Sequence, residues 1–197
     1  TFRNELFDNY KAQRPDVPED LLTQLPVAIS WVEKMGFKIA IRTGYEADDM
    51  VASIAKDAKE KGFEVRIVSH DKDLYQLIDD ENSVYLFDPT KKQIINEAKC
   101  IEKYGVTPKQ FIDYQALVGD TADNIPGVKG VGAKTAQTLI EQFGTLENIY
   151  ENIENIDKKR TKELLIEGKE NAFLSKQLVT LKDDCHFISN IDEFSLP

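Results

Sequence analysis

Acidic side chains gather in three short segments of this chain. The segments G-Y-E-A-D-D-M, S-H-D-K-D-L and G-D-T-A-D-N contain Glu46, Asp48, Asp49, Asp71, Asp73, Asp120 and Asp123. Carboxylates held close together raise one another's pKa unless cations neutralise them. Oxygen ligands without histidine or cysteine favour Mg²⁺ or Mn²⁺ over zinc. Two such ions about 4 Å apart can hydrolyse a phosphodiester, because one activates water and the other stabilises the leaving oxygen.

Each acidic segment also has a purely structural explanation. Acids at 46–49 would begin a helix, where the helix dipole favours negative charge. Asp71 could cap the helix that follows it. Asp120 and Asp123 could form turns next to Gly119. These alternatives stay open for each segment taken separately, but the occurrence of all three in one chain favours a metal site.

The elements expected around these acids form an α/β unit. Residues 37–42, 64–69 and 84–87 are rich in β-branched or aromatic side chains and are predicted to be strands. A helical pattern covers 45–61, between the first two strands. Strand, helix and strand in this order predict a parallel sheet with flanking helices. Ligands of such sheets bind beyond the carboxyl ends of the strands, where the acids lie.

The rest of the chain is predicted to be mainly helical. The residues before Val17 have no strong periodicity, and we expect a mobile segment there. The predicted helices cover 107–118, 133–143, 146–153 and, as a pair, 158–181.

The segment 120–136 resembles a phosphate-binding loop without matching one. Gly127 and Gly132 have the spacing of a Walker loop, but Ala133 separates the last glycine from Lys134. A dinucleotide fingerprint also fails, because its third glycine is missing. We therefore expect no nucleotide cofactor, although a nucleotide-dependent P-loop protein remains an alternative.

Composition excludes several classes of protein. The 197 residues are 41% hydrophobic and 30% charged, as in a globular protein, and no apolar run could cross a bilayer. Cys100 and Cys185 form no metal-binding pair, and His70 and His186 are isolated. A net charge of −10 argues against nucleic acid, unless many of the acids bind cations.

Three motifs together carry a family resemblance. G-Y-E-A-D-D, S-H-D-K-D-L-Y-Q-L and G-D-x-x-D-N-I-P-G-V-K-G-V-G-x-K-T-A resemble, in order and separation, the 5′-nuclease domains of the bacterial DNA polymerase I family. The wider group is the 5′→3′ exonucleases and flap endonucleases. The likeness covers nearly the whole chain. It implies a PIN/resolvase-like α/β part at 1–104, with an arch segment at about 3–20. It also implies a helical part at 105–197, with a helix-hairpin-helix motif at about 119–145.

The resemblance assigns roles to the acids and to three cations. All seven acids become ligands, direct or through water, of two Mg²⁺ or Mn²⁺ sites. The arch cations of the family contact the scissile phosphate, so Arg3, Lys11 and Arg14 become candidates for stabilising its charge. Their structural alternative is a solvated basic loop.

The hairpin acquires a different role, in binding a DNA backbone. Gly130 and Gly132 would let a DNA strand approach the protein backbone, and the next helix would direct N–H groups at a phosphate. Lys129, Lys134 and Thr135 would add hydrogen bonds to the phosphates. The resemblance also implies a K⁺ ion held at this hairpin by main-chain carbonyls.

The implied function is that of a structure-selective 5′ nuclease, acting on DNA with 5′ ends, flaps or nicks and on RNA–DNA primers in replication and repair. Its place would be the bacterial cytoplasm, near the nucleoid, and a covalently linked polymerase domain becomes a candidate partner. Family members have two metal-binding aspartates before T-F-R, so we expect this chain to lack two ligands and the first two strands, and to be inactive alone. A non-catalytic module that binds branched DNA is the alternative.

Overall fold

The sheet of this protein is small and mixed rather than parallel. The computed structural model describes residues 1–185 and 194–195, so residues 186–193, which include His186, and 196–197 of the expected helical part lie outside it. The three strands, in the order β1-β2-β3, are β1 (Val65–Val68), β2 (Val84–Asp88) and β3 (Gln93–Ile95). The first pair is parallel, as predicted, and the second is antiparallel. The sequence analysis missed β3, because a three-residue strand after a tight turn has too short a pattern to detect.

The strand predicted at 37–42 is absent. This segment has no regular structure, and the side chain of Ile41 is 65% exposed. Its β-branched composition was the reason for the prediction, but a strand also needs a hydrogen-bonded neighbour. Sheet order places β1 at an edge, and no strand of the described residues pairs with 37–42.

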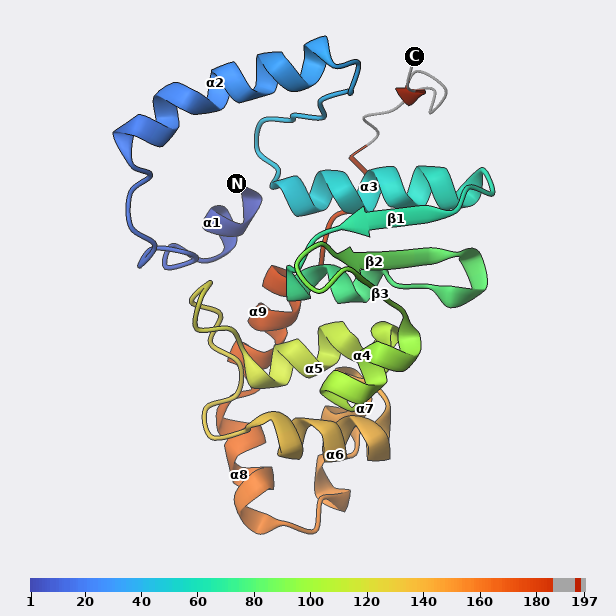
Figure 1. The fold of residues 1–197 in the computed structure, drawn as a ribbon. Coiled ribbons are helices and arrows are strands. Elements are labelled where there is room, and N and C mark those ends of the chain that lie inside the picture. Colours follow the sequence, from blue (N-terminus) through green and yellow to red (C-terminus); the bar gives the residue numbers. More distant parts are fainter. Residues whose placement is uncertain (186–193, 196–197) are drawn as a thin grey trace.

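Helix α3 (Ala47–Glu60) confirms the predicted helix at 45–61. Ala52, Ala55 and Ala58 are buried on one side of it, as their helical spacing indicates. Figure 1 shows α3 running along the sheet beside β1. The helix therefore presents its first turn, with its acids, at one end of the sheet.

The predicted helices after residue 89 are confirmed, with small shifts at their ends, and the helix Glu97–Tyr104 was not predicted. Helix α6, which follows the loop at 120–132, has the predicted bounds. The elements of this part are α4 (Glu97–Tyr104), η3 (Pro108–Gln110), α5 (Phe111–Val118), α6 (Ala133–Phe143), α7 (Leu146–Glu151), η4 (Ile153–Asn155), α8 (Lys159–Glu167) and α9 (Lys169–Val179). In Figure 1 these helices form a layer beyond the sheet, on the side away from α3.

The N-terminal region differs from its prediction. The helix α1 (Phe2–Leu6) lies where a segment without regular structure was expected before Val17, and α2 (Glu19–Lys34) is a further helix that the sequence analysis did not predict. The turn between them is fixed to the loop at 121–124: the Lys11 N–H donates to the Asp123 carbonyl oxygen at 3.0 Å. The Gln13 side chain donates to the Thr121 carbonyl oxygen at 2.8 Å. Residues 9–13 are therefore held in place by the loop that carries two of the acids.

One continuous hydrophobic core connects the sheet to the helices that follow it. An aromatic group joins the short helix η1 (Lys72–Leu77) to α4 and α5. Tyr75 stacks on Phe111 with ring centroids 5.6 Å apart, and Tyr104 meets Phe111 edge-on at 4.8 Å. Such pairs add to the stability gained from burial. They also fix η1, which carries Asp73, relative to α5, which leads into Asp120. In the described residues, no helix is long and apolar enough to cross a membrane.

Candidate active site

Three of the predicted acids meet in one cluster. Asp73 in η1 and Asp120 and Asp123 in the loop after α5 each direct a carboxylate oxygen to a common point, with the three oxygens within 4.8 Å of one another. Asp120 is 8% exposed and Asp123 is 5% exposed. Buried like charges at this separation are unfavourable unless they are neutralised. A divalent cation with oxygen ligands could bind among three carboxylates at this separation.

Two glycines build the loop that holds Asp120. Gly119 and Gly127 have φ angles of 75° and 59°, and their backbones pass against each other. A Cβ at Gly127 would stand 2.5 Å from the Gly119 nitrogen, and one at Gly119 would stand 2.6 Å from the Ile125 oxygen. Asp120 and Ile125 exchange backbone hydrogen bonds of 2.9 and 2.7 Å. The loop is closed at its base, so its two acids have fixed positions.

The acids in this loop and in η1 also have the structural roles considered from the sequence. Asp120 Oδ1 accepts a hydrogen bond from the Ala122 N–H at 2.9 Å, as a turn-forming aspartate does. Asp71 caps η1 by accepting from the Asp73 N–H at 3.0 Å. Each of these carboxylates uses one oxygen for the structural hydrogen bond. A structural role and a role in binding a cation are therefore compatible at these positions.

The carboxyl group of Asp73 has a raised pKa. Burial raises its pKa to about 6, with the charges of Asp71 and Asp120 adding to the rise, although a hydrogen bond from Gln115 opposes it. Gln115 Nε2 donates to Asp73 Oδ1 at 2.6 Å, and Gln115 is only 3% exposed. An acid in this state gains from a nearby cation, because a cation stabilises its charged form.

A second set of acids lies beside the cluster. Burial raises the pKa of Asp48, and repulsion from the nearby charge of Asp71 adds to this rise. Glu46 accepts hydrogen bonds from the Tyr10 hydroxyl at 3.1 Å and from Lys11 Nζ at 2.7 Å. Lys11 thereby connects this set to the first cluster, because its Nζ is also 3.5 Å from Asp123 Oδ2.

Asp49 and Arg3 bind each other in the core beside the acids. Arg3 donates to both carboxylate oxygens of Asp49 at 2.8 Å, and the two residues are 1% and 0% exposed. The N–H groups of Glu46 and Lys182 also donate to Asp49. Asp49 thus has four hydrogen bonds from protein donors, which give it a structural role. Arg3 Nη1 also lies 3.8 Å from Glu46 Oε2, so Arg3 reaches the second set of acids.

The other expected cations do lie at the acids. Arg14 forms an ion pair with Asp123, and Lys11 lies between Glu46 and Asp123. Lys72, which the sequence analysis did not single out, places Nζ 2.9 Å from Asp120 Oδ2. The sequence analysis missed Lys72 and Gln115 because their partners are distant in sequence: Lys72 contacts Asp120, and Gln115 contacts Asp73. The only local signal was the position of Lys72 between two of the acids, in D-K-D.

The expected DNA-binding residues lie on the loop and helix that continue from the cluster. Lys129, Gly130, Gly132 and Lys134 are exposed, and Thr135 is half-buried. Gly132 is the N-cap of α6, with no side-chain hydrogen bond at that end of the helix. The exposed N–H groups of α6 and two lysines thus share one surface.

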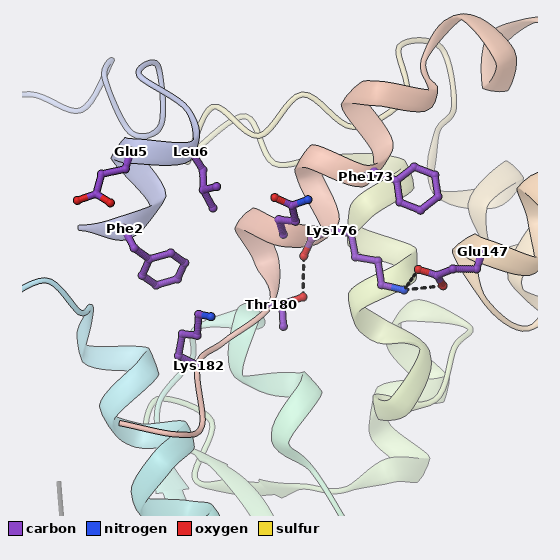
Figure 2. Close-up of a pocket in the computed structure, with 9 residues that line it drawn as sticks. Phe2, Glu5, Leu6, Glu147, Phe173, Lys176, Thr180 and Lys182 are labelled. Carbon is purple, nitrogen blue, oxygen red and sulfur yellow. Dashed lines mark hydrogen bonds and ion pairs between the residues drawn. The ribbon is translucent and has the colours of Figure 1, made fainter. Parts of the chain in front are cut away.

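One hollow on the described surface lies away from these acids. Figure 2 shows it between α1 and α9, where Phe2 and Leu6 face Lys176 and Lys182. Its volume is about 680 Å³, and Lys176 on its wall is paired with Glu147. None of the seven acids lines it, so it contributes nothing to the cluster's chemistry.

An acidic cluster, a small α/β sheet beside it and a helical region with a glycine-rich loop are the features expected of the resolvase-like class. Family comparisons agree with this class. Residues 1–105 match the family model described as "5'-3' exonuclease, N-terminal resolvase-like domain", and residues 106–197 match "5'-3' exonuclease, C-terminal SAM fold". The chain belongs to the 5′-3′ exonuclease family.

Individual relatives support the same assignment. The chain is 41% identical over 201 residues to a 5′-3′ exonuclease of Buchnera aphidicola, covering 99% of this chain and 69% of that protein. It is 42% identical over 186 residues to DNA polymerase I of Deinococcus radiodurans, covering 93% of this chain and 19% of that protein. The chain thus spans about a fifth of the length of the DNA polymerase I relatives.

Solved structures share the fold and include bound ions. Bacteriophage T5 5′-exonuclease with zinc ions has a TM-score of 0.79 and 29% identity, over 98% of this chain and 72% of that chain. A bacteriophage T5 flap endonuclease, in a complex with DNA and metal ions, has the same TM-score, identity and coverage.

Proposed function

We propose that this chain is the catalytic part of a structure-selective 5′ nuclease that hydrolyses phosphodiesters near 5′ ends or flap junctions. The observation that carries this proposal is the meeting of Asp73, Asp120 and Asp123 within 4.8 Å, in a chain of the 5′-3′ exonuclease family. The family assignment comes from the sequence, whereas the cluster of carboxylates is the candidate site for phosphodiester hydrolysis.

Mg²⁺ or Mn²⁺ fits the donors of the cluster. Burial raises the pKa of Asp73, so a bound cation would stabilise its charged form, and the donors are all hard oxygens. Asp48, Asp71 and Glu46 are the candidates for a second site. When bound, the two ions would activate water and stabilise the leaving oxygen.

The cations of this chain would act on the substrate. Lys11 and Arg14 are anchored at acids of both sets, where a phosphate bridging the sites would come within their reach. Lys72 would orient Asp120. The exposed groups of the hairpin (Lys129, Gly130, Gly132, Lys134 and Thr135) would hold a DNA backbone without reading bases, with K⁺ at the hairpin carbonyls.

The substrates would be DNA with 5′ ends, flaps or nicks and RNA–DNA primers, in replication and repair in the bacterial cytoplasm. Two comparisons support this part of the proposal. One neighbour is a flap endonuclease bound to DNA, and many relatives are DNA polymerases I, which favours a covalently linked polymerase domain.

The test is replacement of one ligand of the cluster in the full chain. Asp120→Asn should lower single-turnover cleavage of a 5′-flap substrate by about 1,000-fold, or about 4 kcal/mol in the barrier, while DNA binding without Mg²⁺ is kept. Glu60→Gln, an exposed acid at the end of α3, is the control and should cleave normally.

Normal cleavage by Asp120→Asn would refute the metal assignment. If the full-length protein bound branched DNA but cut none with either Mg²⁺ or Mn²⁺, it would be a non-catalytic binding module.

A further inference from the structure

The N-terminal end of α8 carries an unusual concentration of positive charge. Four of the five residues at 158–162 are basic, in a chain whose net charge is −10. Lys158, Lys159 and Arg160 are exposed. Lys162 pairs with Glu154, and Arg160 makes a longer contact of 3.7 Å with Glu163. In the part of the chain that the structure describes, Lys158 and Lys159 have no ion pair. Cations without partners in an acidic protein suggest an anionic ligand.

Helix α8 packs directly against the hairpin that we propose to hold DNA. A Cβ added to Gly130 would lie 3.1 Å from Leu164 Cδ1, and one added to Gly168 would lie 2.8 Å from Val128 Cγ1. These contacts join both ends of the hairpin segment 128–130 to the second half of α8. The basic end of α8 is therefore held in a fixed place relative to the hairpin.

Two surface hollows pair the cations of the hairpin with those of α8. Lys134 and Lys158 line one of about 350 Å³, together with the hydroxyl-bearing Thr135 and Thr161. Lys129 and Arg160 line the other, of about 480 Å³. Each hollow also includes one acid, Asp157 in the first and Glu167 in the second. Each hollow thus brings a cation at the N-terminal end of α8 together with a cation of the hairpin.

We propose that Lys158 and Arg160 are additional phosphate-binding residues, and that the end of α8 and the hairpin form one continuous surface for a duplex DNA backbone. This inference rests on the proposed function and extends it to an element that the loop motif does not contain. Lysine, arginine and threonine side chains are the usual donors to phosphates, and contacts of this kind add affinity without base specificity. A duplex suits this surface because its phosphates form a regular row, which can reach from one hollow to the other.

The test compares two double variants of the full chain. Lys158→Ala/Arg160→Ala should raise the Kd for a flap duplex about 10-fold at moderate salt. The slope of log K against log salt should become shallower by about 2, since each lost phosphate contact changes it by about 0.9. Cleavage at saturating DNA and the melting temperature should not change. Lys61→Ala/Lys91→Ala removes the same charge from exposed sites at the end of α3 and the β2–β3 turn, far from α8 in Figure 1.

The outcomes separate this inference from the proposed function. An equal loss of affinity in both double variants would overturn the inference, because the effect would then come from net charge alone. An unchanged salt slope would also overturn it. If the parent chain bound DNA through α8 but did not cleave it, the proposed nuclease would fail while the binding surface remained. A parent chain that bound no DNA would overturn both.

Discussion

Arg3 and Asp49 form a fully buried ion pair with two hydrogen bonds of 2.8 Å. Arg3 Nε also donates to the Leu178 carbonyl oxygen at 2.8 Å, and Nη2 donates to that of Thr180 at 3.1 Å. The pair therefore ties α1 and the end of α9 to the first turn of α3. Burial opposes the charge of Asp49, but Arg3 and two backbone N–H groups outweigh it and lower the pKa of the carboxyl. This pair therefore positions the start of α3, where Glu46 is the N-cap and Asp48 lies in the first turn.

Removing one partner of this pair should destabilise the fold strongly. We expect Arg3→Met or Asp49→Leu to lower the free energy of unfolding by about 3–5 kcal/mol, because each leaves an unpaired buried charge. The double variant should lose less than the sum of the single losses. Denaturant unfolding of the four proteins measures this coupling. Arg66→Ala, which breaks an exposed pair with Glu64, should cost less than about 1 kcal/mol. Additive losses at positions 3 and 49 would contradict the buried pairing.

The metal-free protein should become less stable as pH rises through the titration of Asp73. Its folded pKa of about 6 is above the ordinary value, so the folded state binds this proton more tightly. Its contribution to stability is therefore full at low pH, and it is lost from about pH 4 to pH 6, where only the folded state is still protonated. Mg²⁺ should thus raise the melting temperature more at pH 7.5 than at pH 5.

Thermal melts at both pH values, with and without Mg²⁺, check this expectation. Asp73→Asn should remove most of the difference between the two pH values. A Mg²⁺ effect that was the same at both, in the parent chain, would contradict the placement of Asp73 in the cation site.

Two glycines of the loop should respond differently to substitution by alanine. Gly127→Ala should destabilise the protein by about 2–4 kcal/mol, because it combines a positive φ with a backbone overlap. Gly132→Ala should leave stability nearly unchanged, since Gly132 has a φ of −94° and nothing stands within 4 Å of its Cβ position. Denaturant unfolding compares them. Lower DNA affinity in Gly132→Ala, with stability kept, would support the close approach of a DNA backbone.

Arg14→Ala should separate metal binding from catalysis. Arg14 pairs with Asp123 and competes with a divalent ion for that carboxylate, so its removal should raise Mn²⁺ affinity several-fold. Single-turnover cleavage should nevertheless fall by about 10- to 100-fold, because a cation that stabilises phosphate charge is lost. Calorimetric titration and a flap assay measure the two effects. Lys34→Ala, at an exposed position on α2, is the control. Weaker Mn²⁺ binding in Arg14→Ala would contradict the competition.

The sequence by itself determined the helices of the second half and the identity of the cluster. The bounds of α6 and the order of α7, α8 and α9 follow from local periodicity and capping, which act within a few residues. Asp73, Asp120 and Asp123 were chosen for their type and spacing, and the structure brings them together. Their chemistry depends on carboxylate oxygens, which the sequence names directly.

Only the tertiary structure decided which acids face the cluster and which support the fold. Asp48 and Asp49 are adjacent in the sequence and chemically identical, yet a rotation of about 100° around the helix sends Asp49 into the core to meet Arg3. The segment 37–42 likewise has the composition of a strand but no neighbour to pair with. Ion pairs and strand pairing join residues that are distant in sequence, so local patterns do not specify them. The same reason explains why Gln115 and the basic end of α8 acquire their proposed roles only in the folded chain.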